Sequence, residues 1–355
     1  MKQRLVREIV EELEASILSP YAILSTKSMG RQREEEPCSI RTGFQRDRDR
    51  IIHSRAFRQL KYKTQVFLIP SGESIRTRLT HTIEVSQIAR TIARALRLNE
   101  DLTEAIALGH DLGHPAFGHT GELALAHLTS FGFKHNEQSL RVVDLLEKDG
   151  EGLNLTQEVR DGILKHSLGD DDFSQIGNIS KAGPITLEGV VVLFADKIAY
   201  INHDIQDAET AGLISVEELP EDAIRILGRK SSERIDIMVQ AMVTESMGKN
   251  KVEMKRDVLE ASSILRKYLY ENLYRHPRIQ KESDKAKRVI EELFYYYTRI
   301  PDEPKRRFSF LSHETPIERI VVDHLASFSD REALSSYKKV FFPTPWEEEV
   351  LSSMF

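Results

Sequence analysis

Two histidines and two aspartates have the side chains best suited to bind a divalent cation. They are His81, the adjacent pair His110 and Asp111, and Asp196. Imidazole and carboxylate ligands together suit magnesium or a divalent first-row metal, and they leave positions open for water and phosphate oxygens. These ligand types fit magnesium, manganese, iron, cobalt, nickel and zinc alike. We therefore expect one divalent ion per subunit.

The residues around His81 predict a helix that turns this side chain towards the interior. Within the predicted helix 80–96, His81 shares one face with Val85, Ile88 and Ile92, at offsets of four, seven and eleven residues. A buried histidine that makes a single hydrogen bond would show the same spacing. Both interpretations remain open for this residue taken by itself.

His110 and Asp111 stand at the end of a second predicted helix, 102–111, and continue its apolar face. A buried carboxylate without a counter-charge is costly, and a bound cation would remove that cost. The alternative is a helix-end pair that faces water. The adjacent His-Asp pair therefore favours a metal site without excluding a surface position.

Asp196 follows the apolar run 190–194 within a predicted helix, 186–212. About 3.6 residues per helical turn place it on one side together with further polar side chains. This polar stripe either lines a pocket or faces solvent. Its other members are Tyr200, His203, Asp204 and Asp207.

The elements that would position these side chains are mainly helices. The fold class that we expect is all-α, with one possible short strand at 64–69 and loops at 19–45 and 168–184. Further helices are predicted at 2–18, 46–63, 120–130 and 156–166, and through most of the chain from 213 to Pro343. We expect an N-terminal helix and loop, a catalytic core and a C-terminal helical region packed on it, at 1–45, 46–212 and 213–355.

Composition restricts the class of protein. The 355 residues are 40% hydrophobic and 30% charged, which is typical of a globular chain. The net charge of -6 gives no general basic field for nucleic acid or membrane. A single cysteine, Cys38, excludes disulfide scaffolds and multi-thiolate zinc sites. No stretch approaches ~18 consecutive apolar residues, and residues 2–18 carry charges throughout, so we expect a cytoplasmic protein.

The run 46–50 alternates arginine and aspartate. This alternation predicts a helix surface whose charges pair with one another. Contacts with phosphate or with another subunit are the alternatives.

The order His, then His-Asp, then Asp resembles the HD superfamily of metal-dependent phosphohydrolases. The resemblance extends to bacterial deoxyguanosinetriphosphate triphosphohydrolase-like proteins and covers residues 19–343, with a weaker match at 324–343. Ala116 and Gln59 depart from the family pattern, and 209–320 does not align. The matching blocks, in family order, are RTGFQRDRDRIIHSRAFRQLKYKTQVF (41–67), RTRLTHTIEVSQIARTIARAL (76–96), ALGHDLGHPAFGHTGE (107–122), FKHNEQSLR (133–141), LNLTQEVRDGILKHS (153–167) and LEGVVVLFADKIAYINHDIQDA (187–208).

This resemblance implies an HD-domain helical fold and hydrolysis of a deoxynucleoside triphosphate, dGTP or several dNTPs, to a deoxynucleoside and inorganic triphosphate. His119 would act as general acid or base, oriented by Glu122 three residues later, with His114 nearby. The implied substrate contacts are Gln65 with the 3′-hydroxyl, Arg78 and Lys197 with the triphosphate, Tyr200 and Asp204 with the sugar, and His135 with phosphate.

The resemblance also implies a homo-oligomer, a tetramer or hexamer, with a possible second dNTP as allosteric effector and possible weak binding of single-stranded DNA. Two other functions use the same residues. One is an HD enzyme for a different phosphate ester, such as a phosphodiesterase or 5′-nucleotidase. The other is a nucleotide sensor or single-strand nucleic-acid binder. Gln65, Arg78, Tyr200 and Asp204 favour the triphosphohydrolase.

Overall fold

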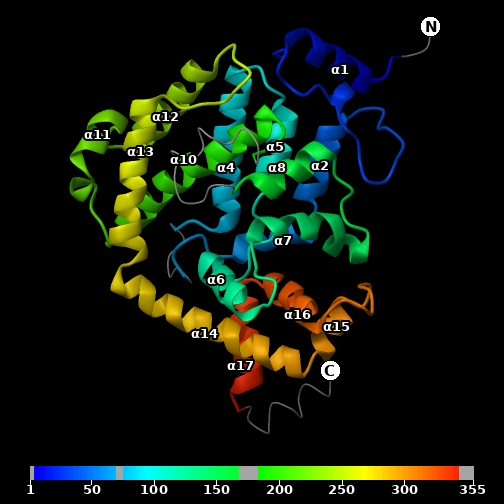
Figure 1. Ribbon diagram of the computed structural model, residues 1–355, viewed down its shortest axis with the longest axis vertical. Helices are drawn as coiled ribbons and strands as arrows, with labels where there is room; N and C mark the ends of the chain where they lie inside the picture. Colours follow the sequence, from blue (N-terminus) through cyan, green and yellow to red (C-terminus); the bar gives the residue numbers. More distant parts are fainter. Residues whose placement is uncertain (1–3, 69–74, 168–182, 344–355) are drawn as a thin grey trace.

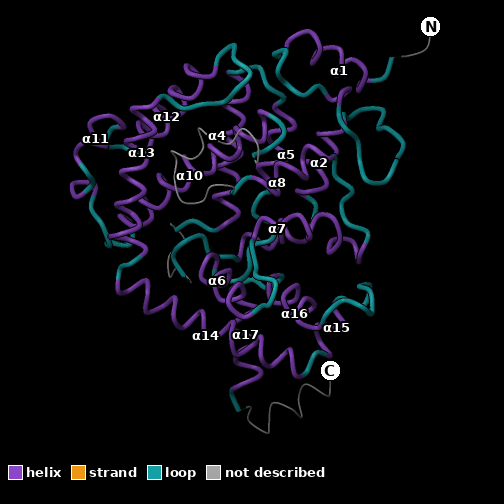
Figure 2. The backbone as a smooth tube through the Cα atoms, viewed as in Figure 1, coloured by secondary structure: helices purple, strands orange, loops and turns teal. Residues whose placement is uncertain are grey.

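The protein is helical throughout the part of the chain that the computed structural model describes, residues 4–68, 75–167 and 183–343. In those ranges the only β-pairing is two isolated bridges, Arg31 with Thr156 and Thr64 with Thr77 (Figure 2). The all-α fold is confirmed. The strand expected at 64–69 is wrong for residues 64–68, because Thr64 has a single bridge partner and its backbone N–H donates to Asp330 instead. Residue 69 lies outside the described part.

The helices before the C-terminal region agree closely with the sequence periodicity. Their bounds are α1 Val6–Ile17, α2 Gly43–Ile52, α3 Arg55–Gln59, α4 Arg78–Ala95, α5 Glu100–Gly109, α6 Gly118–Leu128, α7 His135–Arg141, α8 Gln157–Lys165 and α10 Leu187–Thr210. One expected helix, 46–63, is broken. Ser54 interrupts it and caps α3 by accepting a hydrogen bond from the Phe57 N–H at 3.1 Å. The loop expected at 168–184 lies outside the described residues, apart from 183 and 184.

Three helices form the centre of the molecule: α10 packs against α4 and α5 (Figure 1). Each begins at a polar cap, Thr77 for α4, Asn99 for α5 and Thr186 for α10, whose side chain accepts a hydrogen bond from an otherwise unpaired backbone N–H. The apolar face predicted for α4 is buried in this core. The caps and the apolar faces together fix which side of each helix reaches the centre.

The C-terminal region is also helical. It contains α11 Glu221–Leu227, α12 Ser231–Ser246, α13 Arg256–Leu269, α14 Pro277–Arg299, α15 Asp302–Arg307, α16 Ile317–Ala326 and α17 Asp330–Phe341. Helices α12 and α13 pack on α10, whereas α14 runs beneath α6 and contacts α16 and α17 (Figure 1). A second apolar core forms there, with Leu125 of α6, Ile290 of α14 and Leu325 of α16 among its members. The C-terminal helices therefore support α10 and α6, the two helices that carry most of the candidate site.

The alternating charges of α2 pair differently from the prediction. Asp47 is completely buried, where it accepts hydrogen bonds from Arg31 and Thr156. Within the run only Arg48 and Asp49 contact each other, at 3.2 Å. The other arginines reach acids outside the run, as Arg50 does with Glu35 at 2.7 Å. The prediction of a self-paired surface is therefore wrong for most of the run. Its charged side chains instead connect α2 to the preceding loop and to α5.

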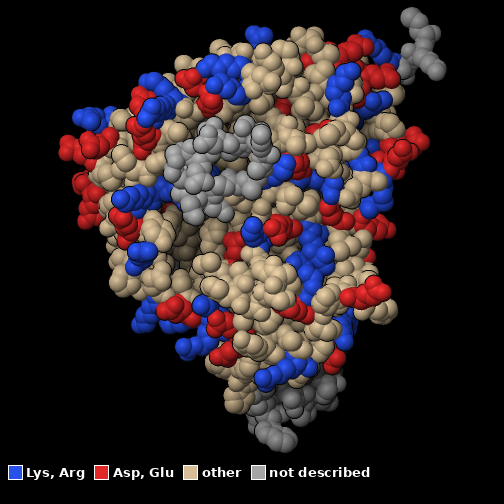
Figure 3. All heavy atoms as spheres, viewed as in Figure 1, with Lys and Arg blue, Asp and Glu red and all other residues tan. Residues whose placement is uncertain are grey.

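The surface charge is mixed. On the face that Figure 3 shows, basic and acidic side chains are interspersed. Among the described helices none is long and apolar enough to span a membrane.

Candidate metal centre and active site

The four residues predicted as metal ligands meet at the crossing of α4, the end of α5 and α10. His81 Nε2 lies 3.0 Å from Asp196 Oδ1. His110 Nε2 lies 3.4 Å from Asp111 Oδ2 and 3.8 Å from Asp196 Oδ1. His81, His110 and Asp111 are buried, while 23% of the Asp196 side chain is exposed. We call these four residues the His110 cluster; its Asp196 side is open to solvent.

The hydrogen bonds of His110 leave one ring nitrogen available for a cation. Its Nδ1 lies 2.6 Å from the carbonyl oxygen of Ala107, so Nδ1–H donates there and Nε2 is the nitrogen that could bind a cation in place of a proton. That Nε2 is buried and has no hydrogen-bond partner among the described residues. A buried acceptor between two carboxylates, on a ring oriented by a backbone carbonyl, is the arrangement that metal-binding histidines have. The residues therefore fit a divalent metal ion.

The electrostatics of the His110 cluster also favour a cation. Burial alone would raise the pKa of Asp111, but the charges of His110 and Arg78 outweigh it and hold that pKa well below its usual range. Burial opposes protonation of His110, yet Asp111 and Asp196 raise its pKa to about 9. The negative charge that would retain a proton here would equally attract a metal ion.

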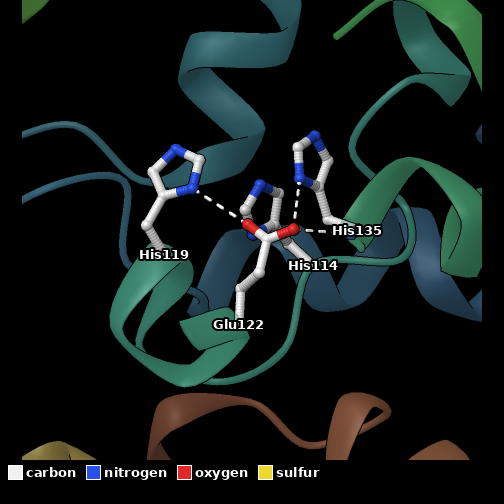
Figure 4. Close-up of side chains that lie close together, drawn as sticks. All are labelled: His114, His119, Glu122 and His135. Carbon is white, nitrogen blue, oxygen red and sulfur yellow. Dashed lines mark hydrogen bonds and ion pairs between the residues drawn. The ribbon is translucent and has the colours of Figure 1, made fainter. Parts of the chain in front are cut away.

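A second group of side chains lies beside the first and is built around Glu122 of α6 (Figure 4). The Glu122 carboxylate accepts a hydrogen bond from His119 Nδ1 at 3.0 Å and another from His135 Nδ1 at 2.8 Å. The His114 ring stacks on His135, with centroids 4.1 Å apart. We call these four residues the Glu122 cluster. Its sequence-predicted contact, His119 with Glu122, is present.

His119 is the exposed member of the Glu122 cluster, with 65% of its side chain accessible, against 14% for Glu122. Burial would raise the pKa of Glu122, but His135 and His119 outweigh it, so the pKa lies far below its usual range. Glu122 therefore stays ionised and holds His119 in one orientation. The second nitrogen of His119 remains available for proton transfer.

A glycine allows the start of α6 to approach the His110 cluster. Gly118 has a φ of +56°, and a Cβ there would lie 3.0 Å from Arg78 Nη2 and 3.2 Å from the carbonyl oxygen of Gln65. Arg78 is buried, and its Nη1 donates to Asp111 Oδ2 at 2.6 Å. The glycine therefore leaves room beside α6 for the Arg78 guanidinium that contacts Asp111.

Two predicted sugar contacts on α10 have partners from the C-terminal region. The Tyr274 hydroxyl donates a hydrogen bond to Asp204, and burial raises the pKa of Asp204 to about 7. Burial also raises the pKa of Tyr200, which Arg266 of α13 opposes through its charge and a hydrogen bond. Tyr274 and Arg266 lie within 209–320, the stretch that the sequence motifs left unaligned, so the sequence motifs gave no role to either residue.

The other two predicted substrate contacts are also inside the protein. Gln65 is buried and its Oε1 has no hydrogen-bond partner among the described residues. Lys197 is 6% exposed and stands one residue after Asp196 on α10. Both are therefore placed to contact a ligand only if it enters the interior.

Two histidines that received no role in the sequence analysis complete the site. His166 Nε2 lies 3.1 Å from His135 Nε2, and its ring centroid lies 4.9 Å from that of His110. His203 Nδ1 lies 3.2 Å from His81 Nδ1. His166 therefore connects the two clusters, and His203 orients His81. His166 continues the apolar face of α8, seven residues after Val159, which is the signal that could have found it.

Comparison with known proteins agrees with this description. The HD domain family matches residues 78–201, and the phosphohydrolase-associated domain matches 252–339, a stretch that includes Arg266 and Tyr274. A crystallised protein of Aquifex aeolicus shares 20% identity with a TM-score of 0.45, covering 85% of this chain and 69% of its own.

Three curated relatives match nearly the whole chain, and all are named deoxyguanosinetriphosphate triphosphohydrolase-like protein. The protein from Caldanaerobacter subterraneus subsp. tengcongensis is 56% identical, covering 97% of this chain and 98% of its own. Those from Desulfatibacillum aliphaticivorans and Clostridium perfringens are 49% and 47% identical, covering 96% and 95% of this chain and 99% and 98% of their own. The chain therefore belongs to the deoxyguanosinetriphosphate triphosphohydrolase-like proteins and is an HD-type phosphohydrolase.

Proposed function

We propose that this protein hydrolyses deoxynucleoside triphosphates, dGTP or several dNTPs, to the deoxynucleoside and inorganic triphosphate in a reaction that depends on one divalent metal ion per subunit. The observation that carries the proposal is the buried Nε2 of His110, which lies between two carboxylates without a hydrogen-bond partner in the described part of the chain, close to the His119–Glu122 pair. The names of the relatives support the choice of substrate.

The metal ion would be held by His81, His110, Asp111 and Asp196. When bound, such an ion neutralises the negative charge that develops on phosphoryl oxygens. Arg78 contributes positive charge at the same place, since its guanidinium already contacts Asp111 at 2.6 Å. Lys197, on the same helix as Asp196, would add a second cation for the triphosphate.

Proton transfer is assigned to His119. Because Glu122 accepts from Nδ1, the Nε2 atom would exchange a proton with the attacking water or with the leaving 5′-oxygen. His135 receives the same orientation from the second oxygen of Glu122, and His114 stacks on it. Those two side chains would face the phosphates.

The sugar would lie against α10. Gln65 has a buried side-chain oxygen that no other described residue contacts by a hydrogen bond, which suits a hydrogen bond from the 3′-hydroxyl. The Tyr200 ring would contact the 2′ carbon of the sugar and leave no room for a 2′-hydroxyl. Asp204, held by Tyr274, would complete this side of the pocket.

The same family membership supports three further proposals. The protein would act as a cytoplasmic homo-oligomer, a tetramer or hexamer. A second dNTP would serve as allosteric effector. Binding of single-stranded DNA would be weak at most, because the net charge is -6 and phosphate contacts need clustered lysine and arginine.

The reaction is tested by incubating the purified chain with manganese or magnesium and each dNTP, singly and as a mixture of all four, and separating the products by chromatography. We expect deoxynucleoside and intact triphosphate in equal amounts. Faster turnover in the mixture than with single substrates would support an activating dNTP. Orthophosphate or pyrophosphate as the first product, or no product from metal-loaded protein, would contradict the proposal.

A further inference from the structure

A second cavity lies apart from the two clusters, between α3, the 142–149 segment, α15 and α16. Its volume is about 80 Å³, and neither the metal ligands nor His119 line it. Three basic side chains do: Arg55, Lys63 and Arg307. The wall also includes Phe308. This combination of cations and an apolar wall belongs to no part of the catalytic site described above.

The two arginines of this cavity have no acidic partner. Neither Arg55 nor Arg307 makes an ion pair with any residue that the structure describes. Arg307 instead lies over the rings of Phe308 and Phe328, 5.9 and 5.8 Å from their centroids. Burial, and then the nearby charge of Arg55, lowers the pKa of Arg307, whereas the charges of Glu332 and Glu303 act to raise it. The two guanidinium groups are therefore close enough to repel each other.

The third cation is more deeply enclosed. Lys63 is 2% exposed, and its ammonium donates to the carbonyl oxygens of His114 at 2.5 Å and Ala326 at 2.9 Å. Within the described residues no carboxylate oxygen lies within ion-pair distance of it. Burial lowers the pKa of Lys63 to about 7, so its ammonium is only partly charged near neutral pH, and an anion in the cavity would favour the charged form.

The acidic residues on the cavity wall are already engaged or lie outside the interior. Asp323 accepts hydrogen bonds from Arg141 and Arg319. Glu147 accepts from the backbone N–H groups of Arg55 and Ala56. The remaining acid, Asp149, is exposed and forms no ion pair in the described part of the chain. Asp323 is thus paired with other arginines, whereas Glu147 and Asp149 offset part of the positive charge at this cavity without forming an ion pair with Arg55, Lys63 or Arg307 in the described part of the chain.

We propose that this cavity binds an oxyanion of the phosphate type, held by Arg55 and Arg307 with Lys63 behind them. Guanidinium groups suit phosphate because their N–H donors match two oxygens at once. A volume of about 80 Å³ admits a tetrahedral oxyanion. It is well below the roughly 300 Å³ or more of sites that enclose a larger ligand. A nucleotide would therefore insert only a phosphate group, so free phosphate and a nucleotide share the same chemistry here.

The proposal is tested on the full-length, metal-loaded protein by calorimetric titration with inorganic phosphate and, separately, with deoxyguanosine monophosphate. The variants are Arg307→Gln and Arg55→Gln. The matched control is Arg306→Gln, which changes an exposed arginine next to Arg307 that does not line the cavity. We expect either cavity variant to weaken phosphate binding about ten-fold or more, the effect of losing a charge-assisted hydrogen bond. The control should bind as the unmodified chain does.

The two ligands separate the two sources of phosphate. If the cavity variants bind both inorganic phosphate and deoxyguanosine monophosphate equally more weakly, the site accepts a nucleotide phosphate. If only the binding of inorganic phosphate is weakened, the site is specific for the free anion. No phosphate binding by the unmodified protein, or unchanged binding in both cavity variants, would overturn the proposal. If Arg307→Gln fails to fold, the exposed Arg55 still permits the test. Because the metal centre can also bind phosphate, the cavity is identified by binding that the cavity variants lose and the Arg306→Gln control keeps, and this comparison does not depend on turnover.

Discussion

The His110 cluster and the Glu122 cluster both consist of imidazole and carboxylate side chains, but the two clusters differ in their hydrogen bonds. In the His110 cluster a buried imidazole nitrogen has no hydrogen-bond partner within 4–68, 75–167 and 183–343, and it lies near two carboxylates. In the Glu122 cluster both carboxylate oxygens already accept from imidazoles, and His119 lies exposed.

This difference indicates separate roles for the two clusters, metal binding for one and proton transfer for the other. A site in which a buried imidazole nitrogen lies beside two carboxylates suits a metal ion, because the ion can bind the nitrogen and the carboxylates together. A site whose acid is fully paired suits proton transfer, because its imidazole is fixed and accessible. His81, His110 and Asp111 of the first cluster, and all four residues of the Glu122 cluster, bring several possible ligand atoms close together, so proximity alone does not distinguish the two clusters.

The largest effect is expected for His110→Ala. Removing this imidazole should abolish metal retention and turnover together, because the two carboxylates lose the neutral ligand between them. Metal content by elemental analysis and the rate on dGTP measure both. His127→Ala, which removes an exposed histidine of α6, is the control and should behave as the unmodified protein does. Full turnover by His110→Ala would remove it from the ligand set.

His119→Ala should distinguish the roles of the two clusters most clearly. We expect full metal content and a kcat lower by about 10²- to 10⁴-fold, the contribution of a positioned general acid or base. The measurement is steady-state kinetics with metal analysis on the same sample. An unaffected kcat would exclude His119 from the reaction. Loss of metal would show that metal binding and proton transfer are not separated between the two clusters.

Glu122→Gln should have a smaller effect on turnover. The amide keeps the shape but loses the negative charge that orients His119 and His135. We expect a decrease of about 10- to 100-fold, the range found when the carboxylate that orients a functional imidazole is removed. Metal content should not change. A rate equal to that of the unmodified protein would indicate that the charge of Glu122 has no part in orienting His119.

The smallest effect is on stability at acid pH. The pKa of Glu122 is lowered on folding, so its ionised form stabilises the fold above the ordinary value of 4.5, and this contribution is lost as the pH falls further. When the pH falls from 6 to roughly 3, the free energy of unfolding measured with denaturant should therefore decrease by about 2 kcal/mol more for the unmodified protein than for Glu122→Gln. Parallel pH profiles for the two proteins would contradict the strong pairing of Glu122.

The helices that carry the ligands could be predicted because amphipathic spacing and caps are local properties. The expected helix 80–96 agrees with α4, Arg78–Ala95, and His81 lies on its inward face as the spacing indicates. The pairing of His119 with Glu122 was predictable for the same reason, since the two residues are one turn apart.

Contacts between distant segments were not predictable from one sequence. His166 meets His135 across 31 positions, and Tyr274 meets Asp204 across 70. These pairs depend on how α8 packs on α7 and how the chain before α14 returns to α10. The charges of α2 were misread for this reason too, because the partners of Asp47 lie in two remote loops.

The most direct test of the central claim is to locate the metal. A crystal of the full chain grown with manganese, measured for anomalous scattering, would show where the ion binds. We predict one peak among His81, His110, Asp111 and Asp196. A peak between His119 and Glu122 instead, with none at His110, would contradict the assignment of the two clusters.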